Sequence, residues 1–146
     1  MPALRRTHAR GAGRALVAVY GILALAAIGR SSFQILTRFA EAPVAYTLSA
    51  VAAVVYVVAT LALALGWTRI AWVAVVFELV GVLVVGSLSL AAPAALGLEG
   101  ASPFGGQSTV WSVFGAGYLF VPLALPVLGI VWLRSVRRAG ASAVAD

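Results

Sequence analysis

The chain has 146 residues, of which 63% are hydrophobic and 10% are charged, and its mean hydropathy is +1.08. This composition is far more apolar than a soluble domain requires, so it argues against a soluble enzyme and predicts one transmembrane domain over 1–146. The net charge is +6, and the basic residues are all Arg and concentrate toward the chain ends. We therefore expect this charge to orient the protein against anionic lipids, and not to bind nucleic acid.

The beginning of the chain predicts a cytoplasmic tail followed by a first membrane span. Residues 1–13 hold Arg and small residues without an apolar period, so we expect an irregular tail. The apolar run from Ala15 is interrupted by Arg30 but continues on one face to Phe39, which predicts a span at about 14–40. A basic stretch before an apolar run is also the pattern of a secretory signal peptide, so cleavage of this segment is the alternative.

Turn-forming residues divide the rest of the chain into three further apolar segments. Pro43 ends the first segment, because Pro lacks an amide donor and disfavours helix in the residue before it. A short Gly-Trp-Thr-Arg turn at 66–69 makes the next two segments a helical hairpin. The three segments predict membrane spans at about 44–66, 70–90 and 111–133.

Two irregular regions are expected in the second half of the chain. Segment 91–110 is rich in Gly and Pro and contains Glu99, so it predicts an outer loop that cannot remain exposed to lipid. Pro122 and Pro126, with nearby glycines, predict that the fourth helix is kinked or irregular. A small polar tail is expected at 135–146.

The ends of the chain also predict its orientation. An even number of spans places both termini on one side, and both termini are rich in Arg, which favours the cytoplasm. The sequence therefore predicts an all-α, polytopic transmembrane four-helix bundle with both termini inside. Aromatic residues near the predicted span ends are expected to form an interfacial belt; they are Trp67, Trp72, Trp111, Trp132 and Tyr46.

Glu78 is the only acidic residue within a predicted span. At ~1.5 Å per residue it lies roughly 12 Å beyond the 66–69 turn, which is near mid-membrane. A carboxylate at this depth costs a few kcal/mol, so it should face the bundle interior, be paired or be protonated, and Tyr56 and Thr60 are candidate partners at its depth. Two interpretations are open: a proton-relay or ligand-anchoring carboxyl, and a neutral Glu that holds helices together.

A second polar group is predicted near the outer end of the first span. Arg30, Gln34 and Arg38 are spaced four residues apart and so share one helix face, with Glu41 three residues further along. Guanidinium groups bind phosphate and carboxylate through two hydrogen bonds, so this stripe is a candidate site for a lipid head group or another anion. In the alternative interpretation, Arg38 pairs with Glu41 and both Arg side chains extend to the membrane interface.

The sequence offers little that could support catalysis or hold a metal. His8 is the only His, and the chain contains no Cys. A Ser, His and acid trio and a cluster of metal ligands are both missing, so we expect no metal, no cofactor and no enzymatic activity.

Three segments resemble a known type of protein. They are Gly-Arg-Ser-Ser-Phe-Gln-Ile-Leu-Thr-Arg-Phe at 29–39, Glu-Ala-Pro-Val-Ala-Tyr at 41–46 and Trp-Ser-Val-Phe-Gly-Ala-Gly-Tyr-Leu-Phe-Val-Pro at 111–122. The chain resembles small actinobacterial four-span integral membrane proteins over most of its length, and its Ala, Val, Gly and Arg bias without Lys is in keeping with a GC-rich genome. The resemblance implies a plasma-membrane location and brings no catalytic residues.

The sequence thus predicts a non-enzymatic accessory or binding protein. It would engage a lipid, an anionic ligand or a membrane complex through its outer face. The alternative is a small transporter or channel subunit, assembled as a homo-oligomer, in which Glu78 carries protons or cations.

Overall fold

The computed structural model describes residues 2–98 and 108–145, and all regular structure within them is helical. This confirms the all-helical prediction, while Glu99 of the expected outer loop lies outside the described residues. The elements in chain order are α1 (Pro2–Arg38), η1 (Phe39–Glu41), α2 (Pro43–Leu65), α3 (Thr68–Ala91), η2 (Pro93–Leu96), η3 (Ser112–Tyr118) and α4 (Val121–Ala145).

Three helical segments are long and apolar enough to cross a membrane, namely 10–41, 43–65 and 68–91. The elements η3 and α4 pass the same test when they are taken together, although they are bent by 98° relative to each other. A fourth segment is present if this pair forms one broken span. By length and composition, the described residues therefore include three, or up to four, segments that are able to cross a membrane.

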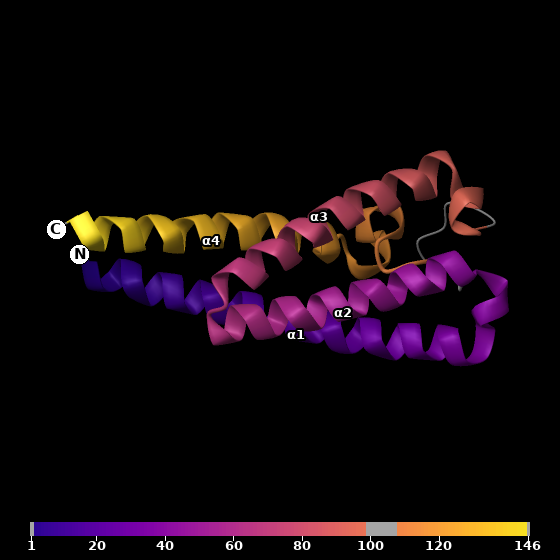
Figure 1. The fold of residues 1–146 in the computed structure, drawn as a ribbon, viewed down its shortest axis with the longest axis horizontal. Coiled ribbons are helices and arrows are strands. Elements are labelled where there is room, and N and C mark those ends of the chain that lie inside the picture. Colours follow the sequence, from indigo (N-terminus) through magenta and orange to yellow (C-terminus); the bar gives the residue numbers. More distant parts are fainter. Residues whose placement is uncertain (1, 99–107, 146) are drawn as a thin grey trace.

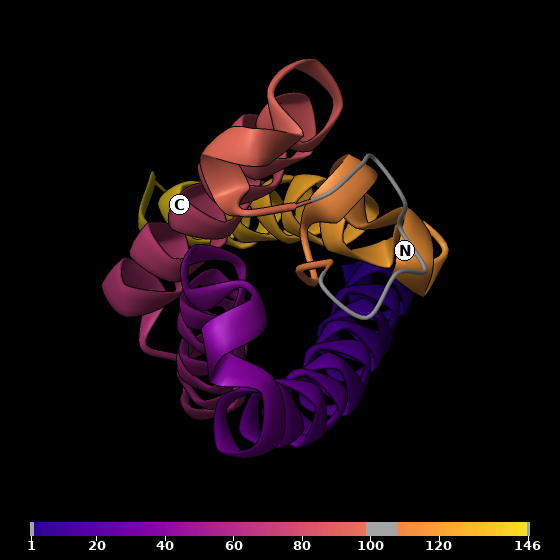
Figure 2. The same cartoon turned by 90° about the vertical axis from the view of Figure 1, so that its right-hand side faces the viewer.

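The four long helices surround a common core (Figure 2). Along this ring α1 packs on α2, α2 on α3, α3 on α4, and α4 on α1. Both termini lie at one end of the molecule, and η1 and η2 lie at the other (Figure 1). We call these the terminal end and the loop end.

The Arg-rich ends of the chain are helical, which corrects the expectation of irregular tails. α1 begins at Pro2 and α4 continues to Ala145, so both helices extend past the turn between α2 and α3 (Figure 1). Ala and Arg favour helix, and these residues add to helices already nucleated in the apolar segments. An apolar period is absent from these ends, so periodicity could not indicate the extensions.

The sequence predicted a span from about residue 111, but in the structure no continuous helix begins there. Val113, Phe114 and Gly115 have φ values of 49°, 58° and 78°, and Leu119 and Phe120 are also left-handed. Left-handed residues cannot continue a right-handed helix, so the chain bends and α4 starts only at Val121. The irregularity expected from the prolines is therefore real, but the break precedes both of them, and Pro126 lies inside α4.

Two of the five aromatic residues expected in an interfacial belt are buried instead. Trp111 is 2% exposed and donates its indole N–H to the Tyr56 hydroxyl at 2.9 Å. Tyr46 is 0% exposed, and its hydroxyl donates to the Glu41 carboxylate at 3.4 Å. Each ring is buried and its polar atom has a partner on the protein, so neither needs the membrane interface.

Candidate functional site around Glu78

Glu78 lies in the interior of the ring of helices and is 0% exposed. The Tyr20 hydroxyl, on α1, donates a hydrogen bond to Oε2 of Glu78 at 2.6 Å. The other carboxyl oxygen, Oε1, has no hydrogen-bond partner among the described residues. The carboxyl is thus anchored through one oxygen and can bind a ligand through the other.

Three aromatic residues from three different segments surround this carboxyl. Tyr56 on α2 lies with its ring centroid 6.4 Å from that of Tyr20, and the two rings are inclined by 51°. Trp111, immediately before η3, donates its indole N–H to the Tyr56 hydroxyl. We call Tyr20, Tyr56, Glu78 and Trp111 the Glu78 cluster; all four are buried.

Glycines let large side chains approach the helix backbones at this cluster. A Cβ on Gly81 of α3 would lie 2.6 Å from the Trp111 ring, so the indole rests against the backbone about one turn beyond Glu78 toward the loop end. A Cβ on Gly129 of α4 would lie 3.2 Å from Val75 and 3.6 Å from the Tyr20 hydroxyl. All four long segments of the chain therefore meet at the level of Glu78.

The residues predicted to partner Glu78 are placed differently from expectation. Tyr56 is in the cluster but bonds to Trp111, and Thr60 donates to the backbone oxygen of Tyr56 within its own helix at 2.6 Å. Tyr20 is the partner that sequence reasoning missed. In the sequence, Tyr20 stands out as a single Tyr within the apolar run of the first span. The position of a residue along the helix does not show which side of α1 faces α3, so this partner could not be predicted.

The predicted Arg30, Gln34, Arg38 and Glu41 stripe divides into two parts. Arg30 Nη2 donates to the backbone oxygen and to Oγ of Ser108, at 2.9 and 2.6 Å, and Gln34 Nε2 donates to the same backbone oxygen at 3.3 Å. Arg38 instead pairs with Glu41 at 3.6 Å, and both of these side chains are about half exposed. The inner part thus binds the protein's own chain, and the outer part forms an exposed ion pair.

Arg30 also lies near the other end of the irregular segment that it contacts. Its guanidinium carbon is 6.0 Å from the centroid of the Tyr118 ring, close to the limit for a cation–π contact. Because Ser108 precedes η3 and Tyr118 is its last residue, Arg30 contacts both ends of this segment. We call residues 108–120 the re-entrant segment, since its chain turns into the core at Trp111 and then leads back into α4.

The re-entrant segment is bound to α3 through its backbone. The amide of Val113 donates to the Ser89 hydroxyl at 2.8 Å, and that hydroxyl donates to the backbone oxygen of Gly86 at 2.8 Å. A Cβ on Gly86 would lie 2.5 Å from the Phe114 ring, so only Gly leaves room for this contact. Buried non-helical backbone needs hydrogen-bond partners and close packing from the surrounding protein, and Ser89 and Gly86 supply both.

The chemistry available at the Glu78 cluster is that of a single carboxyl surrounded by aromatic rings. Oε1 can take up a proton or a singly charged cation, and tyrosine and tryptophan faces are favourable neighbours for a cation. Comparison of the chain with protein-family models, curated proteins and solved structures finds no match. Function is therefore inferred from the geometry of this site.

Proposed function

We propose that the chain crosses a plasma membrane four times, with the broken η3–α4 pair as its fourth span and both termini in the cytoplasm. The Arg residues near the chain ends support this orientation, and the sequence resemblance to small actinobacterial four-span proteins supports the number of spans and the plasma-membrane location. The loop end is then the outer end. A topology reporter fused after Asp146 should report the cytoplasm, and one inserted after Glu99 should report the outside; the reverse result would overturn the orientation.

We propose further that the protein is a small transporter or channel subunit whose Glu78 binds a proton or a singly charged cation at mid-membrane. The observation that supports this is a fully buried carboxyl with one bonded oxygen and one oxygen without a partner. Ionisable groups inside membrane segments are costly and mark ion pathways. A carboxyl that served only to join helices would gain by bonding through both of its oxygens.

The broken fourth segment gives independent support for a role in transport. Transporters place discontinuous helices beside their ion sites, where freed backbone groups and half-helix ends surround the ion. Here the left-handed residues that interrupt the fourth segment follow Trp111, which is itself part of the Glu78 cluster. The break and the carboxyl therefore belong to one region of the core.

Infrared difference spectroscopy of the reconstituted protein tests the role of Glu78. A change of pH should produce a carboxyl C=O band that disappears in E78Q and remains in E41Q, since Glu41 is an exposed carboxyl at the loop end. Proteoliposomes with an internal pH dye should show proton movement that E78Q abolishes and E41Q retains. An unchanged band and unchanged proton movement in E78Q would overturn the proposal.

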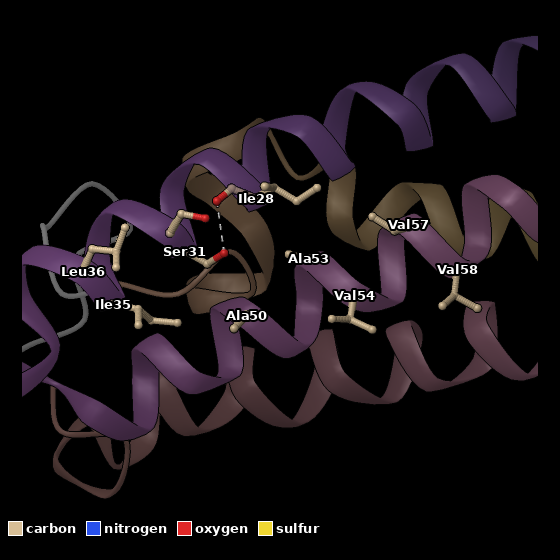
Figure 3. A pocket seen from close by; sticks show the side chains of 10 residues that line it. Ile28, Ser31, Ile35, Leu36, Ala50, Ala53, Val54, Val57 and Val58 are labelled. Atoms are coloured by element: carbon tan, nitrogen blue, oxygen red, sulfur yellow. Dashed lines mark hydrogen bonds between the residues drawn. The ribbon is translucent and has the colours of Figure 1, made fainter.

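A second candidate function is the non-enzymatic binding of an anionic lipid at the outer face. A groove of about 500 Å³ lies between α1 and α2, lined by apolar residues of both helices such as Ile35 and Val54 (Figure 3). Arg38 lies just beyond the groove on α1 and is about half exposed, so a lipid could place an acyl chain in the groove and its head group at Arg38.

Native mass spectrometry separates this candidate from general lipid binding. Bound phosphatidylglycerol should exceed bound phosphatidylcholine, and R38Q should remove the difference. R69Q serves as the matched control, because Arg69 lies in the first turn of α3, whereas Arg38 lies at the end of α1 near the loop end. Equal binding of both lipids by the unmodified protein would exclude a specific site.

A further inference from the structure

The buried polar side chains of the described residues are distributed unevenly about Glu78. Those on the long helices lie between Glu78 and the loop end, and in the re-entrant segment Ser108 is bonded to Arg30 and Gln34 while Thr109 and Ser112 bond to each other. Helix direction shows this, since α1 and α3 run toward the loop end and α2 runs away from it (Figure 1). The buried set, apart from Glu78, comprises Ser31, Gln34, Ser49, Ser89, Ser108, Thr109 and Ser112.

The core on the opposite side of Glu78 is lined by apolar side chains. The buried residues there are aliphatic and come from all four long helices; they include Leu16, Ala62, Leu63, Ala71, Val75 and Leu133. Near the terminal end a Cβ on Gly13 of α1 would lie 2.6 Å from the Trp132 ring of α4, so these two helices are in close contact. A hydrated ion would find polar partners on one side of Glu78 and an apolar barrier on the other.

We propose that, in the conformation of this structure, Glu78 exchanges its proton with the loop end only, through a hydrated polar route that passes Ser49. This inference rests on the proton-binding role proposed above for Glu78. Ser49 is 0% exposed, and its hydroxyl, like Glu78 Oε1, has no hydrogen-bond partner among the described residues. Buried polar atoms that the protein leaves unpaired are usually satisfied by water, so the route carries water at Ser49 Oγ and at Glu78 Oε1.

The route has an order that follows from helix geometry. It begins where Arg30 and Gln34 meet Ser108, and it continues to Ser49, which lies about 10 Å from Tyr56 along α2. It then passes the hydrogen bond between Trp111 and Tyr56, and the Trp111 ring lies against Gly81. A hydronium ion from the loop end passes its proton to Oε1 of the ionised Glu78 and becomes water, and on release a water molecule takes the proton back, while Tyr20 keeps its own proton and donates to Oε2.

Cysteine accessibility tests the one-sided route, because the chain has no native Cys. The matched pair is S49C and A62C: both positions are 0% exposed on α2, and they lie at similar distances on either side of Tyr56. A charged, membrane-impermeant methanethiosulfonate reagent is added to sealed vesicles of known orientation. S49C should react from the loop-end side at least about tenfold faster than A62C reacts from either side.

The outcomes separate this inference from the function on which it rests. Faster reaction of A62C, or equal rates, would overturn the one-sided route, and so would a complete lack of reaction at S49C. The infrared band assigned to Glu78 is measured on the same vesicles, so a failed route with an intact band leaves the proton-binding role standing. Size-exclusion profiles and full labelling after denaturation establish that each variant is folded and carries its thiol.

A second measurement does not depend on the fold of the A62C variant. S49A removes the hydroxyl while keeping a small residue in an Ala-rich face of α2. Hydrogen–deuterium exchange of the Glu78 carboxyl, followed by its infrared band after a change to D₂O on the loop-end side, should be several-fold slower in S49A. An unchanged exchange rate would overturn the passage through Ser49.

Discussion

The hydroxyl of Tyr20 on α1 donates a 2.6 Å hydrogen bond to the carboxyl of Glu78 on α3, and so joins two helices that lie diagonally across the core. The bond from Trp111 to Tyr56 joins the re-entrant segment to α2, across the other diagonal. Helices that are neighbours in the ring pack directly on each other. The diagonal contacts are therefore made through these polar side chains, and their removal has distinct consequences.

Y20F should destabilise the protein by about 1–3 kcal/mol, because it leaves a buried carboxyl without its donor. The double variant Y20F/E78M should be as stable as the unmodified protein or more stable, since it replaces the buried polar pair with apolar groups of similar size. Unfolding by SDS or heat in mild detergent measures both effects. A double variant less stable than Y20F alone would show that Glu78 has a further stabilising contact.

G81A should cost roughly 1–3 kcal/mol, because its Cβ would overlap the Trp111 ring, which is held by its bond to Tyr56. G29A is the matched control on α1, since no atom lies within 4 Å of a Cβ at that position. This control should be neutral or gain up to about 1 kcal/mol from better helix propensity. Thermal unfolding of the two variants side by side gives the comparison, and equal stabilities would contradict the contact.

G115A and G66A separate backbone strain from steric overlap. Both glycines are left-handed, with φ values of 78° and 72°, so either substitution should cost about 1–2 kcal/mol from the backbone alone. A Cβ on Gly115 would also lie 2.7 Å from Pro122, whereas nothing lies within 4 Å at Gly66. G115A should therefore be clearly the less stable of the two in thermal unfolding; the opposite order would place the re-entrant segment elsewhere.

R30K should loosen the re-entrant segment, because a lysine cannot reproduce the position of the guanidinium group between Ser108 and Tyr118. Amide hydrogen exchange should become several-fold faster over residues 108–120, including Val113, whose amide is bound by Ser89. R38K is the control, since the exposed pair with Glu41 contributes about 0–1 kcal/mol. Exchange that accelerates equally in both variants would exclude a specific role for Arg30.

The sequence predicted the burial of Glu78 and one ion pair, but it did not predict which residue Arg30 binds. Glu78 was predicted to face the interior, and its side chain is fully buried. Arg38 and Glu41 were considered as a pair, and they do form one. Arg30 was placed in the same stripe, yet its partner is Ser108, which is 78 residues away in the chain and has no sequence pattern that links it to Arg30.

The boundary errors have a common physical origin. Residues 2–13 and 134–145 are helical because a preformed helix extends readily through residues of good propensity, and such extension needs no apolar period. The break before α4 depends on left-handed conformations at Val113 and Phe114, residue types that rarely adopt them. Contacts with Ser89 and Gly86 select this conformation, so local residue preference could not predict it.

The sequence by itself determined that the chain is helical and that its helices are long and apolar enough to cross a membrane. It also predicted how far along its own helix each polar residue of the long helices lies, because a helix rises by about 1.5 Å per residue whatever surrounds it. Only the tertiary structure decided which residues meet at a given depth, since the rotation of each helix depends on packing against its neighbours. That rotation joins Glu78 to Tyr20 rather than to Tyr56, and the break in the fourth segment brings Trp111 beside them.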